Sequence, residues 1–189
     1  MRARCKACLF YWVARVFNPD DIAAAQTLLA RLRASRATIA TAESCTGGLI
    51  SALLTEVPGS SDVVDRGLVT YSNGAKCDLL GVPATLIARY GAVSAEVAVA
   101  MVGGALRAST ADIAVAVTGI AGPGGASPGK PVGLVHIAAQ ARGARVLSLE
   151  LNFGEIGRSE VRIATVRAAL ALVHQTLDAA AGTVPAGAP

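Results

Sequence analysis

The stretch TAESCTGG at residues 41–48 places two nucleophilic side chains, Ser44 and Cys45, between two apolar runs. The residues that follow them are Thr46, Gly47 and Gly48. If a helix starts here, its free backbone N–H groups can bind an oxyanion or a phosphate. Adjacent residues on a turn point in different directions, so only one of the two nucleophiles can face a substrate. Ser and Thr also serve as plain helix caps, and the spacing alone does not separate that role from catalysis.

Lys76 is the residue that could act as a base for Ser44. It lies near the start of a predicted helix, where the macrodipole disfavours a cation. Burial would lower its pKa further from the usual value of about 10.4. A neutral Lys76 could then accept the proton of Ser44, as in Ser–Lys hydrolases, and Tyr71 could relay that proton or orient the amine. The alternative is a solvated surface lysine.

Three other positions offer weaker chemistry. His136 lies inside an apolar strand and His174 near the end of the last helix, so we expect neither to act as the base. The Gly/Pro-rich run that begins with Thr118 and Gly119 would let the backbone come close to a ligand. That run is not a Walker A phosphate loop, because proline follows its only lysine, Lys130.

The composition suits one domain with a core of small aliphatic residues. The chain has 189 residues, of which 53% are hydrophobic and 4% aromatic. We expect the domain at residues 19–181, after an N-terminal extension at 1–18 and before a disordered tail at 182–189. The apolar part of the extension, residues 9–13, is shorter than the core of a signal peptide.

Charge and cysteine content exclude several classes of protein. The net charge of +4 comes from scattered arginines without an aromatic-rich basic patch, so we expect no nucleic-acid partner. No uncharged apolar run is long enough to span a membrane. The four cysteines are too few and too scattered for a disulfide framework, which favours the cytoplasm. Cys5 and Cys8 form a lone C-x-x-C pair, so we expect no metal site.

The reactive residues must be positioned by strands and helices that alternate along most of the chain. Buried and β-branched runs predict strands at 37–42, 67–71, 112–117, 134–139 and 146–151. Capping residues and helical spacing predict helices at 20–35, 49–56, 83–90, 94–109 and 158–180, and another that starts near 72. This order predicts a three-layer α/β/α sandwich around a mixed, mostly parallel sheet with one antiparallel strand.

Three polar turns each follow a predicted strand, at residues 41–48, 70–76 and 118–131. In a parallel α/β sheet, ligands bind where the carboxyl ends of the strands meet. We therefore expect the three turns to converge at one edge of the sheet and to form the site together.

Several motifs together resemble the C-terminal domain of the competence/damage-inducible CinA proteins, the family of nicotinamide-nucleotide amidases. In chain order they are TAESCTGG, RGLVTYSNGAK, GAVS, TGIAGPGG and KPVG, within residues 20–180. The resemblance implies a mixed sheet of about five strands, a homo-oligomer and the stand-alone form of this domain. It also implies hydrolysis of nicotinamide mononucleotide to nicotinate mononucleotide and ammonia, without a metal or a cofactor.

The resemblance also implies roles for individual residues. Ser44 becomes the nucleophile, Lys76 its base and Tyr71 an assisting hydroxyl. Thr118 falls in the family's substrate loop, and Gly119 follows it.

One segment departs from the family pattern, which commonly has Gly-Asp-Arg before the last helix. Arg158 matches the arginine as a substrate-binding residue, but Gly157 stands in place of the aspartate, and whether Glu155 substitutes for it is open. The alternative function is therefore a non-catalytic nucleotide-binding or regulatory module that has lost turnover. A DNA-binding competence factor is the third and weakest interpretation.

Overall fold

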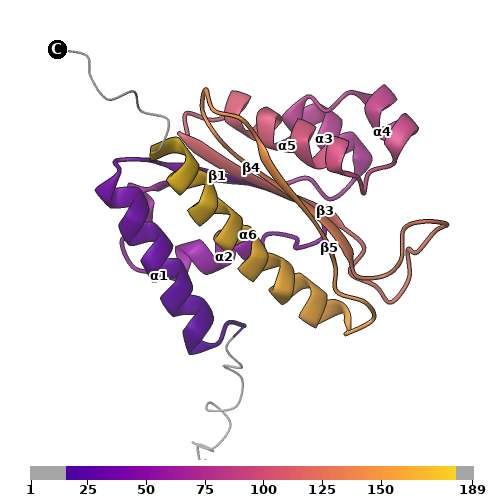
Figure 1. Cartoon of the computed structure of the whole chain (residues 1–189), viewed down its shortest axis with the longest axis horizontal. Helices are drawn as coiled ribbons and strands as arrows, with labels where there is room; N and C mark the ends of the chain where they lie inside the picture. Colours follow the sequence, from indigo (N-terminus) through magenta and orange to yellow (C-terminus); the bar gives the residue numbers. More distant parts are fainter. Residues whose placement is uncertain (1–15, 182–189) are drawn as a thin grey trace, which may run out of the picture.

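Five strands form one mixed sheet in the computed structural model, which describes residues 16–181 (Figure 1). The strands are β1 Ile39–Glu43, β2 Val64–Val69, β3 Ile113–Gly119, β4 Leu134–Ala141 and β5 Leu147–Asn152, in the spatial order β2-β1-β3-β4-β5. β1 pairs in parallel with β2 and β3, whereas β4 is antiparallel to both β3 and β5. The predicted mostly parallel sheet with one antiparallel strand is confirmed. Residues 1–15 and the predicted tail at 182–189 lie outside the described part.

Within residues 16–181, six α-helices and a short 3₁₀ helix, η1 Ser60–Asp62, surround the sheet. The helices are α1 Pro19–Ala34, α2 Leu49–Thr55, α3 Asn73–Leu80, α4 Ala84–Tyr90, α5 Ala95–Arg107 and α6 Arg158–Ala181. α1, α2 and α6 cover one face of the sheet, and α3, α4 and α5 cover the other (Figure 1). The three-layer α/β/α sandwich predicted from the sequence is confirmed. Within residues 16–181, no helix combines the length and the apolarity that crossing a membrane requires.

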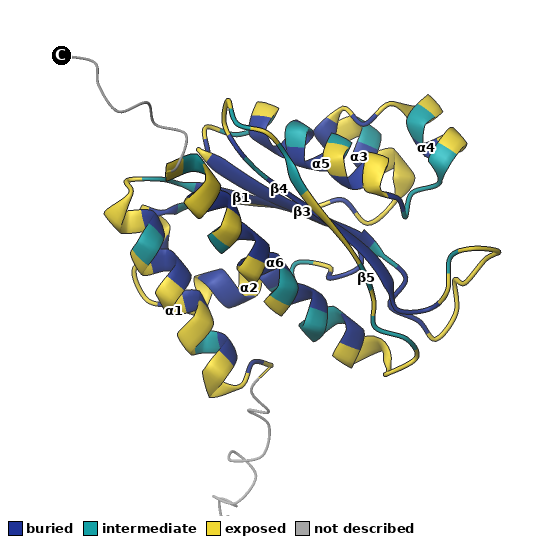
Figure 2. Cartoon of the chain, viewed as in Figure 1, coloured by how far each residue is buried: buried dark blue, intermediate teal, exposed yellow. Residues whose placement is uncertain are grey.

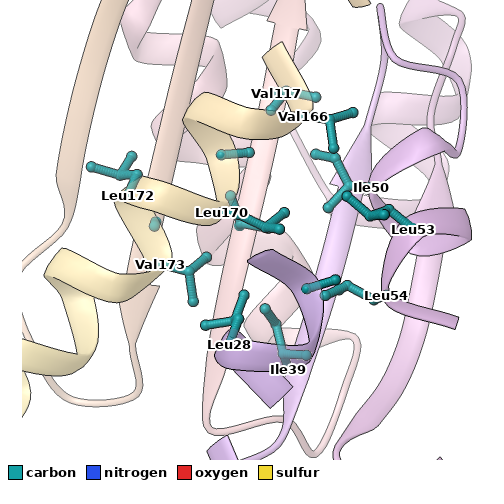
Figure 3. Packing of buried hydrophobic residues seen from close by; sticks show 14 of the residues in the cluster. Leu28, Ile39, Ile50, Leu53, Leu54, Val117, Val166, Leu170, Leu172 and Val173 are labelled. Atoms are coloured by element: carbon teal, nitrogen blue, oxygen red, sulfur yellow. The ribbon is translucent and has the colours of Figure 1, made fainter. Parts of the chain in front are cut away.

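The core lies on both faces of the central strands, which are buried along almost their whole length (Figure 2). On one face, side chains from α1, α2 and α6 gather over Ile39 of β1 and Val117 of β3 (Figure 3). On the other face, small alanines of β1, β3 and β4 meet α5, which lets that helix pack closely. Each fully buried Leu or Ile contributes about 1.5–3 kcal/mol, so this double layer holds the strand ends that carry the site.

β2 begins three residues earlier than the strand predicted at 67–71, because it runs over Val64–Val69. Asp65 and Arg66 carry charges that argue against a buried strand, but β2 is an edge strand and most of its side chains are exposed or half-buried. Thr70 and Tyr71 follow the strand instead of ending it, and the N–H of Thr70 still bonds Glu43 O at 2.7 Å.

The contact between α3 and α5 gives a stability prediction at Gly104. A Cβ at this position would lie 2.2 Å from Leu80 O, whereas a Cβ at the neighbouring Gly103 meets only the flexible end of Arg107, at 3.4 Å. We expect Gly104→Ala to lower the free energy of unfolding by about 1–3 kcal/mol through overpacking. Gly103→Ala should instead raise it by up to about 1 kcal/mol, because alanine favours the helix. Urea denaturation of both variants tests this, and equal effects at the two positions would contradict the packing described here.

Candidate active site

The three predicted turns converge at the carboxyl ends of β1, β2 and β3, where they enclose a cavity of about 230 Å³. The residues that line it are Ser44, Cys45, Tyr71, Asn73, Lys76, Ala92, Val93, Thr118, Gly119, Ala121 and Arg158. The predicted convergence is therefore confirmed. Six of the nine residues expected to form the site line this cavity, and the other three do not.

The turn after β1 is built around the carboxylate of Glu43, which is fully buried. Six donor groups surround its two oxygens at 2.7–3.2 Å. They are the hydroxyls of Thr41, Thr46 and Ser51 and the backbone N–H groups of Gly48, Ile50 and Ser51. The Glu43 carboxylate thus accepts hydrogen bonds from the free N–H groups at the start of α2 and lies at the positive end of that helix.

Two glycines allow the chain to turn from β1 into α2 at this point. Gly47 and Gly48 have φ angles of +61° and +96°, in the region that side chains with a Cβ rarely adopt. Gly48 is the N-cap of α2, and no side chain caps the helix at that residue. Glu43 supplies the missing cap from five residues upstream.

The expectation that Gly47 and Gly48 bind the substrate through their N–H groups is corrected by this geometry, whereas binding through the backbone N–H of Thr46 stays a prediction. The N–H of Gly47 bonds Ser44 O at 3.0 Å, and the N–H of Gly48 bonds Glu43 at 3.0 Å. Thr46 is fully buried and donates its hydroxyl to Glu43 at 2.7 Å. The N–H of Gly48 and the hydroxyl of Thr46 are therefore already bonded to a carboxylate from the chain itself, and the N–H of Gly47 to a backbone carbonyl.

Lys76 and Ser44 lie together on the floor of the cavity. Lys76 is only 1% exposed, and its Nζ lies 2.9 Å from both Ser44 Oγ and Thr70 O. Side chains of a helix tilt toward its N-terminus, so a lysine one turn into α3 reaches back to the end of β1. No carboxylate among residues 16–181 forms an ion pair with it. Burial therefore lowers the pKa of Lys76 from its usual value near 10.5.

Cys45, the alternative nucleophile, is in a poor electrostatic setting. It is 6% exposed, and burial raises the pKa of its thiol to about 12. Hydrogen bonding from the backbone N–H groups of Cys45 and Thr46 opposes this rise in the pKa. A thiol with such a pKa contains almost no thiolate at neutral pH, which favours Ser44 as the nucleophile.

Tyr71 and Arg158 stand at the outer rim of the cavity. Tyr71 is 60% exposed, and Arg158 Nη2 donates to its hydroxyl at 2.9 Å. Arg158 Nη1 donates to Gly122 O at 2.9 Å, so this arginine links the second turn to the third. Within the described residues no carboxylate forms an ion pair with Arg158. Its positive charge is therefore available to an anionic ligand.

Thr118 and Gly119, at the end of β3, form the opposite wall. Thr118 is 1% exposed and donates its hydroxyl to Ala92 O at 2.8 Å. A Cβ on Gly119 would lie 2.7 Å from a methyl group of Val135, so a larger residue would disturb the pairing of β3 with β4. Both residues line the cavity but end β3 instead of following it as predicted, and their contact with substrate stays a prediction.

Neither histidine reaches Ser44. His136 lines a separate cavity and lies 3.7 Å from Glu150, while His174 contacts Arg31 at 2.9 Å. Among the residues that the structure describes, no three His, Cys, Asp or Glu side chains come together as metal ligands. The lone C-x-x-C pair lies outside that part of the chain.

Comparison with known proteins decides the family. The sequence model of the CinA C-terminal domain matches residues 21–177. The chain belongs to the CinA C-terminal domain family.

Several CinA relatives and solved structures are similar to this chain. It is 48% identical over 162 residues to a CinA-like protein of Synechococcus sp. (strain RCC307) and 44% identical over 164 residues to a putative competence-damage inducible protein of Moorella thermoacetica. These alignments cover 85% and 87% of the chain but only 39% of each relative. The crystal structure of the competence/damage inducible protein CihA from Agrobacterium tumefaciens has 52% identity and a TM-score of 0.83, over 86% of this chain and 98% of that one.

The segment that departs from the CinA pattern lies just before α6. Gly157 has a φ of +102°, and Glu155 is exposed and does not line the cavity. Arg158 nonetheless reaches the site from the first position of α6. In this chain the arginine is therefore held by Tyr71 and Gly122 O, without help from Glu155.

Two residues important for the geometry of the CinA site were not assigned from the sequence. Glu43 stood in the quoted stretch without a role, although three hydroxyl residues at 41, 46 and 51 around it hint at a buried carboxylate. Arg162 of α6 donates to Thr46 O at 2.7 Å and supports the turn from behind. No local pattern marks Arg162, because the contact joins residues 116 positions apart.

Glu43→Gln should destabilise the fold strongly. In either orientation the amide NH₂ meets at least one backbone N–H, because both carboxylate oxygens accept from backbone donors. We expect a loss of about 2–4 kcal/mol in the free energy of unfolding, measured by chemical denaturation. Glu56→Gln is the matched control, because Glu56 is exposed at the other end of α2 and should change stability by less than about 0.5 kcal/mol. A Glu43→Gln variant as stable as the control would contradict the capping role.

Proposed function

We propose that this chain is an amidohydrolase that converts nicotinamide mononucleotide to nicotinate mononucleotide and ammonia. The observation that carries the proposal is the 2.9 Å separation between Ser44 Oγ and the Nζ of a buried lysine with a lowered pKa. A lysine that is neutral near physiological pH can activate a serine hydroxyl, which is otherwise a weak nucleophile. Membership of the CinA family and the order of its motifs support the choice of substrate.

Acylation begins with a neutral Lys76, whose lone pair accepts the Ser44 proton while its own N–H donates to Thr70 O. Ser44 Oγ forms a bond to the carboxamide carbon, and the proton moves to Lys76 Nζ. The backbone N–H groups of Cys45 and Thr46, which follow Ser44 directly in this turn, stabilise the resulting oxyanion. When the C–N bond breaks, Lys76 returns the proton to the nitrogen, which leaves as ammonia.

Deacylation uses the same groups. Water adds to the ester carbon while Lys76 accepts one of its protons. Collapse of this second tetrahedral intermediate breaks the bond to Ser44 Oγ, which regains the proton from Lys76. The product leaves as a pyridine carboxylic acid, which ionises in solution.

The phosphate of the substrate is recognised at the rim, because Glu43 already fills the N-terminus of α2. Arg158 offers a guanidinium without an ion-pair partner among the described residues, and it can bind a phosphate through two parallel hydrogen bonds. A cavity of about 230 Å³ then accommodates the pyridine ring next to Ser44.

The second candidate function is a nucleotide-binding module without turnover. Gly157 favours it, because an aspartate commonly present in the family is absent and Glu155 does not take its place at the cavity. Such a module would bind nicotinamide mononucleotide and release no ammonia.

Ammonia release from purified protein tests the proposal. Incubation with nicotinamide mononucleotide should give ammonia, free nicotinamide should give far less, and Ser44→Ala should abolish release while Cys45→Ala retains it. Thermal stabilisation by nicotinamide mononucleotide without ammonia would favour the binding module instead.

Lys76→Arg should lose about 10²–10⁴-fold in kcat while the protein stays folded, because a guanidinium remains protonated and cannot act as a base. In the wild type, only the neutral form of Lys76 is active, so the acylation rate should rise with pH through its lowered pKa and level off above it. Single-turnover kinetics from pH 6 to 10 measure this profile. Near-normal turnover by folded Lys76→Arg would reject the Ser–Lys mechanism.

A further inference from the structure

Residues 91–93, between α4 and α5, form one wall of the candidate active site. Ala92 and Val93 line the cavity that contains Ser44 and Lys76. The segment has no regular secondary structure, so its carbonyl groups need partners from elsewhere in the chain. The contacts that hold residues 91–93 in place therefore set the width of the cavity.

Lys130 supplies one of those partners and also binds the carbonyl group just before the segment. Its Nζ donates to Tyr90 O at 2.5 Å and to Val93 O at 2.6 Å, at the two ends of the segment. Between them, Thr118 Oγ1 donates to Ala92 O at 2.8 Å. Three carbonyl groups around the wall, those of residues 90, 92 and 93, are thus bonded to side chains from the end of β3 and from the loop that follows it.

The ammonium group of Lys130 is dedicated to this segment. Among residues 16–181 no carboxylate forms an ion pair with Lys130, so its charge faces backbone carbonyls. Gly91 packs directly on it: φ is +75°, and a Cβ there would lie 2.6 Å from Nζ. A residue larger than glycine at position 91 would therefore displace the Lys130 amine.

We propose that Lys130 is a positioning residue, which clamps residues 91–93 at the distance from Ser44 that the substrate requires. Lys130 does not line the site cavity itself and acts through Ala92 and Val93. The clamp also joins two walls, because Thr118 lies near the end of β3 and Lys130 in the loop that follows this strand. The effect on catalysis rests on the proposed amidase function, whereas the effect on the mobility of the wall does not.

Lys130→Met tests the clamp, because it keeps the length and the apolar stem and removes the donors. We expect amide hydrogen exchange of the peptide covering residues 90–98 to become at least about tenfold faster, since local opening no longer breaks charged hydrogen bonds. KM for nicotinamide mononucleotide should rise by about 10–100-fold, with kcat changed less than about threefold. Lys130→Gln, which can still donate to one carbonyl, should fall between the two.

Arg145→Met is the matched control, because Arg145 is an exposed cation in the hairpin at the opposite end of β4. It should leave both exchange and KM unchanged. Unchanged exchange in Lys130→Met overturns the clamp, and faster exchange with an unchanged KM overturns its role in substrate binding. If the wild type releases no ammonia, the amidase proposal fails, and the exchange comparison alone decides whether Lys130 holds the wall.

Discussion

The buried carboxylate of Glu43 is the constraint on which the candidate site depends. Its six surrounding donors tie the last residue of β1 to the first turn of α2. Because Ser44 follows Glu43 directly, this network fixes the backbone that carries the proposed nucleophile. The same carboxylate occupies the positive end of α2, where a phosphate would otherwise bind. In the proposed function the anionic group of the substrate therefore binds at the rim, where Arg158 has no ion-pair partner in the described part of the chain.

The engagement of Glu43 with α2 also explains the electrostatics of Lys76. Both oxygens of the carboxylate face donors of their own turn and helix, and Lys76 meets only Ser44 Oγ and Thr70 O. A counterion would hold the lysine positive, whereas burial without one lowers its pKa. A buried amine of this kind disfavours folding while it is charged, which is a common feature of functional sites. Lys130 differs from Lys76 in its partners. Its amine donates to two backbone carbonyl groups and to no hydroxyl within residues 16–181.

Much of this structure could be predicted from local pattern, because strands, helices and turns leave short-range signals. The β-branched run at β3 and the Gly-rich turns are enough to predict that Ser44, Lys76 and Thr118 meet at one edge of the sheet, where all three line the cavity. The sequence could not show which backbone N–H groups already have a hydrogen-bond partner within the fold. The N–H groups of Gly47 and Gly48 have the right pattern for an anion site, yet contacts within the fold already use them. β2 likewise begins earlier than predicted, at Val64, because an exposed edge strand tolerates charged side chains.

A direct titration of Lys76 tests the central claim that its amine is a base held neutral by burial. The sequence contains lysine only at Lys6, Lys76 and Lys130, so protein labelled with ¹³Cε-lysine gives three NMR signals, which the Lys76→Arg and Lys130→Met variants assign. The Cε shift of each lysine reports its own protonation as pH is raised. The Lys76 signal should titrate with a midpoint well below 10.5. A midpoint at or above 10.5 would show that the lysine stays charged beside Ser44 and would contradict the proposed mechanism.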